Sequence, residues 1–142
     1  MLSAPNRAFA TVRNLFEWLA PVPVPGDHDF RARWLRLASE RGSPVMVCEP
    51  WLSPVELDGA WRASIETPAQ SVRRIVGRLN PNLNVEFILV DDALSLRCGE
   101  FHATLVTRET AKVEADIWAK GWQTRRWRKL AVTDLPLFAK RH

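Results

Sequence analysis

The sequence predicts an α+β domain in which three helices pack on a curved, mostly antiparallel sheet of about five to six strands. Apolar residues recur at helical spacing near the N-terminus and again over 68–79, whereas from residue 84 onward they alternate with a period of two. The chain has 142 residues, of which 46% are hydrophobic, so its size and composition predict one folded domain, 1–142.

Residues 1–41 form the predicted helical part. A first helix is expected over 5–19, where Ser3 can cap the N-terminus and Pro5 suits the first turn. Its apolar stripe consists of Ala8, Phe9, Val12, Leu15, Phe16 and Leu19. Three alternating prolines in 21–27 end this helix, because proline cannot continue one.

A second helix is expected over 29–40, with Asp27 or Asp29 as its cap. The apolar side of this helix consists of Phe30, Trp34, Leu37 and Ala38. The run Gly42-Ser43-Pro44 ends it, since such clusters mark turns.

The next part, 45–66, is expected to form a short β pair around the turn-rich stretch 49–59. The Thr67-Pro68 step then starts a third helix over 68–79, with threonine as the cap and proline at the first helical position. The inward residues of this helix are Val72, Ile75, Val76 and Leu79.

An antiparallel meander is expected over 84–132, followed by a basic tail, 133–142. Its strands are 84–90, 94–98, 101–108, 111–119 and 122–132, and the strictest alternation lies in 111–119. Lys120-Gly121 makes a hairpin turn, because glycine adopts a positive φ without strain. No internal sequence repeat is visible.

This order of elements resembles the cone-shaped nuclear-transport-factor-like fold. The resemblance rests on topology and carries no motif, and that fold hosts many functions. It therefore implies a curved sheet on helices and no particular activity.

The net charge of +4 is unevenly distributed along the chain. Residues 120–142 carry seven Lys and Arg against one Asp, whereas 1–119 carry 13 basic and 15 acidic residues. Such asymmetry predicts an acidic or polyanionic partner for the C-terminal end. The candidate binding residues in this segment are Trp122, Arg125, Arg126, Trp127, Arg128 and Lys129.

The hairpin prediction contains a conflict. With the turn at Lys120-Gly121, Arg126 and Arg128 point to the same face as Val113, where uncompensated burial of guanidinium groups is prohibitive. A water-filled pocket, a strand that runs past the sheet edge, or a β-bulge would each resolve this conflict. In the first two cases the arginines are placed to meet an anion, for which the planar guanidinium is suited.

The preferred functional hypothesis is a non-catalytic binding domain whose basic, Trp-containing C-terminal strand contacts nucleic acid or an acidic protein surface. One alternative is a small pocket protein or enzyme of nuclear-transport-factor-like shape that binds an anionic small molecule. In that case His102 and Asp116 are the candidate proton-transfer groups. Another alternative is an adaptor or assembly subunit of a larger complex.

The sequence lacks phosphate-binding glycine loops, zinc-protease motifs and paired-cysteine metal motifs. We therefore expect no cofactor and no metal, and the hypothesis leans away from an enzyme. Cys48 and Cys98 are expected to be buried free thiols. No run of 18 apolar residues occurs, so a cytoplasmic protein without membrane spans is expected. The sequence leaves room for a homo-oligomer.

Overall fold

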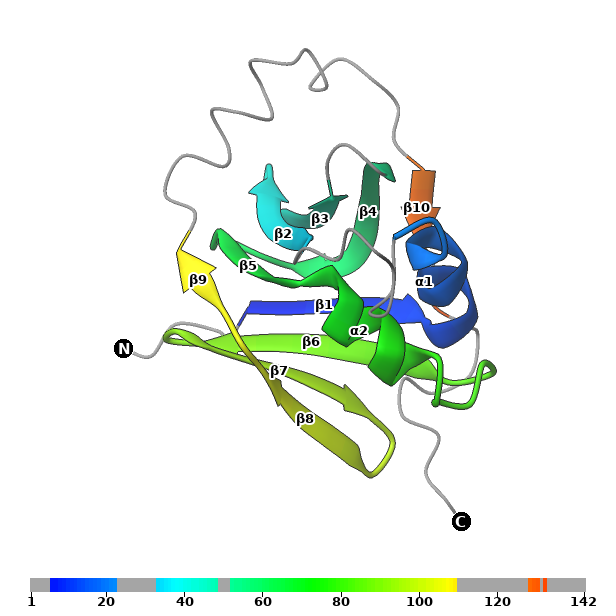
Figure 1. The fold of residues 1–142 in the computed structure, drawn as a ribbon. Coiled ribbons are helices and arrows are strands. Elements are labelled where there is room, and N and C mark those ends of the chain that lie inside the picture. The colour runs from blue at the N-terminus through cyan, green and yellow to red at the C-terminus, as the bar shows by residue number, and fades with distance from the viewer. Residues whose placement is uncertain (1–5, 23–32, 49–51, 110–127, 131, 133–142) are drawn as a thin grey trace.

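The computed structural model describes residues 6–22, 33–48, 52–109, 128–130 and 132, and its architecture is dominated by strands (Figure 1). The first half contains β1 (Asn6–Thr11), α1 (Val12–Leu19), β2 (Trp34–Glu40), β3 (Ser43–Cys48) and β4 (Leu52–Ala60). The second half contains β5 (Ile65–Pro68), α2 (Ala69–Val76), β6 (Asn84–Val90), β7 (Ala93–Cys98), β8 (Phe101–Leu105) and β9 (Arg108–Glu109). A last strand, β10, spans Arg128–Leu130.

One ten-stranded sheet wraps around the core. Its strand order is β8-β7-β6-β1-β4-β3-β2-β5-β9, and every pair along this path is antiparallel. The two ends of this order, β8 and β9, are separated in the chain by Val106 and Thr107 alone, so the sheet almost closes on itself. The predicted three helices on a curved sheet of five to six strands are therefore wrong: the described residues form two helices and ten strands. The nuclear-transport-factor-like cone is overturned with them.

The element order β-α-β-β-β occurs twice, as β1-α1-β2-β3-β4 and as β5-α2-β6-β7-β8. The strand pairings repeat as well. The β1–β6 pair corresponds to the β5–β2 pair, and the β4–β1 pair corresponds to the β9–β5 pair. Through these registers Phe9 is equivalent to Glu66 and Asp58 to Arg108. Equivalent pairs such as these differ in chemical type, so the repeat is not visible in the sequence.

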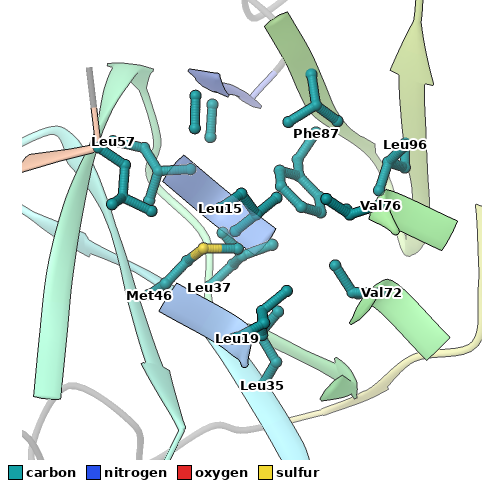
Figure 2. Close-up of a cluster of buried hydrophobic side chains, with 14 of the residues drawn as sticks. Leu15, Leu19, Leu35, Leu37, Met46, Leu57, Val72, Val76, Phe87 and Leu96 are labelled. Carbon is teal, nitrogen blue, oxygen red and sulfur yellow. The ribbon is translucent and has the colours of Figure 1, made fainter. Parts of the chain in front are cut away.

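Both helices contribute to a single buried cluster with the inward faces of the strands. Figure 2 shows Leu15 and Leu19 of α1 and Val72 and Val76 of α2 among strand residues such as Phe87. The fully buried larger side chains of the cluster include Trp61, Leu35, Leu37, Met46, Leu57, Leu94 and Leu96. The sheet and the helices are thus held together by one core.

The segment predicted as the helix 29–40 contains a strand instead. Residues 34–40 form β2, in which Leu35 and Leu37 point into the core while Arg36 lies on the other face. The residues WLRLASE satisfy the period-two pattern as well as the helical one, and pairing with β3 and β5 decides between them. Residues 23–32 lie outside the described part.

The first helix is half as long as predicted. Residues 6–11 form β1 between β4 and β6, and Thr11, not Ser3, caps α1 by accepting a hydrogen bond from the Asn14 backbone N–H at 3.0 Å. The apolar positions at helical spacing belong to two elements: Ala8 and Ala10 alternate on a strand, and Leu15 and Leu19 follow on the helix.

The predicted β pair over 45–66 omitted its longest strand. Residues 52–60, expected as a turn, form β4 beside β3, and 61–64 lie between strands. Pro54 is tolerated because the register between β3 and β4 shifts between Met46 and Cys48, which leaves an extra residue on β4.

The third helix and the first part of the meander are confirmed. Helix α2 occupies 69–76 within the predicted 68–79, although the N-cap residue is Pro68 and Thr67 is buried in β5. Strands β6, β7 and β8 pair in antiparallel sequence around turns at Asp91 and Gly99. The predicted strand 111–119 and its hairpin turn lie outside the described residues.

Two buried carboxylates bridge strands on the outer face of the sheet. Glu66 of β5 accepts from Arg36 and Arg108, each at 2.6 Å. Glu86 of β6 forms ion pairs with Arg7 at 3.1 Å and Arg97 at 2.8 Å. Each bridge joins three neighbouring strands, one of which belongs to the first half of the repeat, so these arginines have structural partners.

Both cysteines are free and buried, as expected. Burial raises the pKa of the Cys48 thiol to about 12 and also raises the pKa of Cys98. The thiolate is the reactive form, so neither thiol is expected to react with Ellman's reagent at pH 8 in the folded protein within minutes. Both should react once the protein is unfolded in urea, and fast reaction of the folded chain would contradict this prediction.

Candidate nucleic-acid interface

The helices α1 and α2, which are the second elements of the two repeat units, contact each other (Figure 1). Phe16 of α1 and Arg73 of α2 occupy equivalent positions, since each is the fifth residue of its helix. The Arg73 guanidinium carbon lies 5.8 Å from the Phe16 ring centroid, a cation–π distance. A Cβ on Gly77 would lie 3.1 Å from the Phe16 ring, so the ring rests closely on α2.

The sides of these helices that face away from the core carry arginines. Arg13 and Arg74 are exposed, Arg73 is half-buried, and Arg78 is exposed directly after α2. Glu17 is the only acidic residue on either helix. We call Arg13, Arg73, Arg74 and Arg78 the arginine face.

The arginine face has no carboxylate partners within the described residues. The basic residues with ion pairs among the described residues all lie on strands and are Arg7, Arg36, Arg97, Arg108 and Lys129. Arg13 donates a hydrogen bond to the neutral amide oxygen of Asn82, at 3.4 Å. Each of these strand arginines therefore contacts a carboxylate, whereas the four helix-side arginines contact none among the described residues.

Helix stability accounts for only part of the arginine face. Basic residues in the last turn of a helix interact favourably with its dipole, and Arg73 and Arg74 occupy that turn of α2. Arg78 lies beyond the helix, and Arg13 lies in the first turn of α1, where a positive charge is unfavourable. The dipole therefore does not explain why all four arginines share this side.

Most of the sequence-predicted site lies outside the described residues, namely Trp122, Arg125, Arg126, Trp127 and Asp116. Arg128 and Lys129 lie in β10, which pairs in parallel with β4. His102 is exposed on β8, opposite Arg97.

Lys129 makes a structural contact. Its Nζ lies 2.7 Å from Asp58 Oδ1, and the other oxygen of that carboxylate accepts from the Val132 backbone N–H at 3.3 Å. The hydrogen bond with Asp58 raises the pKa of Lys129. Leu130 is fully buried in the core cluster, so β10 is anchored to β4 from both faces.

Within the described ranges, no three His, Cys, Asp or Glu side chains gather in a way that could hold a metal ion. Neither helix is long or apolar enough to cross a membrane, over the same residues.

Comparisons with solved structures place the fold. No family model matches the chain, and no curated protein matches it. A crystal structure of the DnaN sliding clamp, the DNA polymerase III subunit beta, from Bartonella birtlesii bound to griselimycin matches with a TM-score of 0.61 at 17% identity. That match covers 75% of this chain and 31% of the clamp.

Two further clamp structures agree. A second structure from Bartonella birtlesii LL-WM9 gives a TM-score of 0.59 at 18% identity, over 74% of this chain and 32% of the clamp. The Pseudomonas aeruginosa clamp bound to griselimycin gives 0.60 at 18%, over 75% and 31%. The chain therefore shares the fold of part of a sliding clamp and spans about a third of the length of these clamps.

Proposed function

We propose that this chain is a non-catalytic nucleic-acid-binding domain of the sliding-clamp fold, whose arginine face contacts the phosphate backbone. The observation that carries the proposal is the set of three arginines on α1 and α2, together with Arg78 just after α2, without carboxylate partners in the described structure. The likeness to the DNA polymerase III sliding clamps supports nucleic acid over other polyanions.

The chemistry of the arginine face suits phosphate and not bases. A guanidinium presents a planar fork of donors that matches phosphate oxygens, and contacts to the backbone carry no sequence information. Binding through this face is therefore expected to be independent of sequence and to weaken steeply with salt, because each neutralised phosphate releases counterions.

The basic C-terminal segment is proposed as a second contact to the same ligand. Trp122, Arg125, Arg126, Trp127, Arg128 and Lys129 combine basic and stacking side chains. Lys129 is already paired with Asp58, so Arg125 and Arg126 are the residues to test in this segment.

The test is fluorescence anisotropy of a labelled duplex titrated at about 50 and 200 mM salt. A duplex of about 20 base pairs is long enough for the protein to contact several phosphates. Arg74→Ala/Arg78→Ala is expected to weaken binding about tenfold or more at the lower salt. The slope of log K against log salt should fall by about two, one for each lost phosphate contact.

The matched control is Arg41→Ala/Arg62→Ala, which removes the same charge from two exposed arginines outside both helices, one in the turn between β2 and β3 and one between β4 and β5. If this control weakens binding as much as the helix variant, net charge and not the arginine face is responsible. A third variant, Arg125→Ala/Arg126→Ala, measures the C-terminal segment separately. Absence of duplex and single-strand binding at the lower salt would refute the proposal.

A further inference from the structure

The last strand of each repeat unit, β4 or β8, has a side that faces away from its hairpin partner, and the two sides differ in what covers them. In the first half Val45 of β3 pairs with Glu56 of β4. In the second half Ser95, fifty positions after Val45, pairs with Thr104 of β8. The stretch 103–105 is thus the equivalent of 55–57, which is the stretch that β10 pairs with.

Among the described residues, the side of β4 that faces away from β3 is covered by β10, and the corresponding side of β8 is open. Strand β8 ends the strand order, and within the described residues its only neighbour is β7 (Figure 1). Leu52 and Phe101 are equivalent, because Leu52 pairs with Cys48 and Phe101 pairs with Cys98. Leu52 is 9% exposed, whereas Phe101 is 40% exposed. Ala103 is likewise half-buried, where Val55 is buried.

The covered edge shows what kind of strand this geometry accepts. Strand β10 runs parallel to β4 and places Leu130 opposite Leu57, fully buried in the core cluster. Lys129 points to the outer face, where Asp58 binds it and Glu56 adds to its favourable electrostatics. A strand that binds at this position therefore needs two neighbouring residues. The first has a charge opposite to that of the outer face, and the second is apolar and points into the core.

Among the described side chains, the outer face beside the β8 edge lacks the acids that line β4. Where β4 presents Glu56 and Asp58, the described side chains of β8 and β9 present Thr104, His102 and Arg108 and no acid. The Arg108 guanidinium bonds Glu66 through Nε and lies over the Trp34 ring, with 3.8 Å between its carbon and the ring centroid. Its side chain is 51% exposed, so its terminal N–H groups can still donate to an acid. An acidic residue fits here as Lys129 fits on β4.

We propose that the open edge of β8 binds a short extended segment of a partner protein in parallel orientation, with an acidic residue opposite Thr104 and an apolar residue opposite Leu105. Main-chain hydrogen bonds to the edge supply affinity, and the two side chains supply specificity, as in strand addition generally. The incoming apolar residue packs beside Leu105 and the half-buried Ala103. This surface is separate from the arginine face, so it stands or falls independently of nucleic-acid binding.

The test uses two labelled heptapeptides based on residues 126–132, with serine in place of Arg126 and Arg128 in both. One keeps lysine at position 129 and the other has glutamate there. The full chain is expected to bind the glutamate peptide about fivefold more tightly than the lysine peptide, the size of an exposed ion pair. Replacing the leucine of the glutamate peptide by serine should weaken binding about tenfold.

Substitution of the edge should reverse the preference. Thr104→Asp makes the β8 edge resemble that of β4, so this variant is expected to favour the lysine peptide. Val90→Asp is the matched control, because it adds the same charge at an exposed position on β6, two strands away, and should keep the wild-type preference.

Three outcomes would overturn the proposal. The first is that neither peptide binds, and the second is that both bind equally to the wild type and to Thr104→Asp. The third is self-association of the wild type, measured by light scattering, that Thr104→Asp abolishes. That result would assign the β8 edge to a second copy of this chain and not to a partner protein.

Discussion

Gly59→Ala is expected to destabilise the protein by about 3 kcal/mol or more, measured as the free energy of unfolding in urea. Gly59 has a φ of +126°, a conformation in which an L side chain is strained. A Cβ at this position would collide with the backbone carbonyl oxygen of Arg7 and lie 3.1 Å from the Cα of Ala8. Both contacts are with the backbone of β1, so β1 itself would have to move away from β4.

Gly42→Ala is the matched control for this substitution. Gly42 also has a positive φ, +88°, but no atom lies within 4 Å of the position its Cβ would occupy. Its cost is therefore the backbone strain alone, about 1 kcal/mol. Equal losses for the two variants would show that the collision with β1 is relieved without cost and would contradict the close approach of β1 and β4.

The local sequence pattern was enough to predict those elements whose apolar spacing and end residues lie in one short stretch of the chain. Strands β6 and β7 alternate over six or seven residues and are bounded by turns at Asp91 and Gly99, both with positive φ. Helix α2 carries its apolar stripe and its proline start in one stretch. No distant segment is needed to explain any of these three.

Local pattern failed where pairing with a distant strand decides the outcome. Residues 34–40 fit both periods, and β3 and β5 select the strand. Pro54 argued against a strand, yet the register shift opposite β3 accommodates it. Near the N-terminus, one apolar stripe was attributed to a single helix although it spans β1 and α1, whose boundary is set at Thr11.

The candidate site was missed for the same reason. Arg13 and Arg74 each lie on the polar side of an amphipathic helix, which alone indicates only a solvated face. They gain a functional interpretation because α1 and α2 contact each other and because the strand arginines are the ones with carboxylate partners. The C-terminal basic segment was visible in the sequence because its charges are contiguous, and its role stays a prediction.

The second large effect concerns the bridge around Glu86. The Glu86 side chain is fully buried, whereas the side chains of Arg7 and Arg97 are 46% and 38% exposed. Removing the carboxylate leaves two arginines that reach water, but removing an arginine leaves a buried carboxylate short of a partner. The cost of breaking a buried ion pair falls mainly on the charge that stays buried.

Arg97→Leu is therefore expected to cost about 3 kcal/mol in the free energy of unfolding, more than Glu86→Leu at about 1–2 kcal/mol. Urea unfolding monitored by tryptophan fluorescence measures both, and the double variant should be less destabilised than the sum of the single ones. Arg62→Leu, at an exposed arginine between strands, serves as the control and should stay within about 0.5 kcal/mol of the wild type. If Arg97→Leu changes the free energy of unfolding no more than that control does, the buried Glu86 carboxylate does not need Arg97 as a partner. The ion pair between β6 and β7 would then contribute nothing to the stability of the sheet.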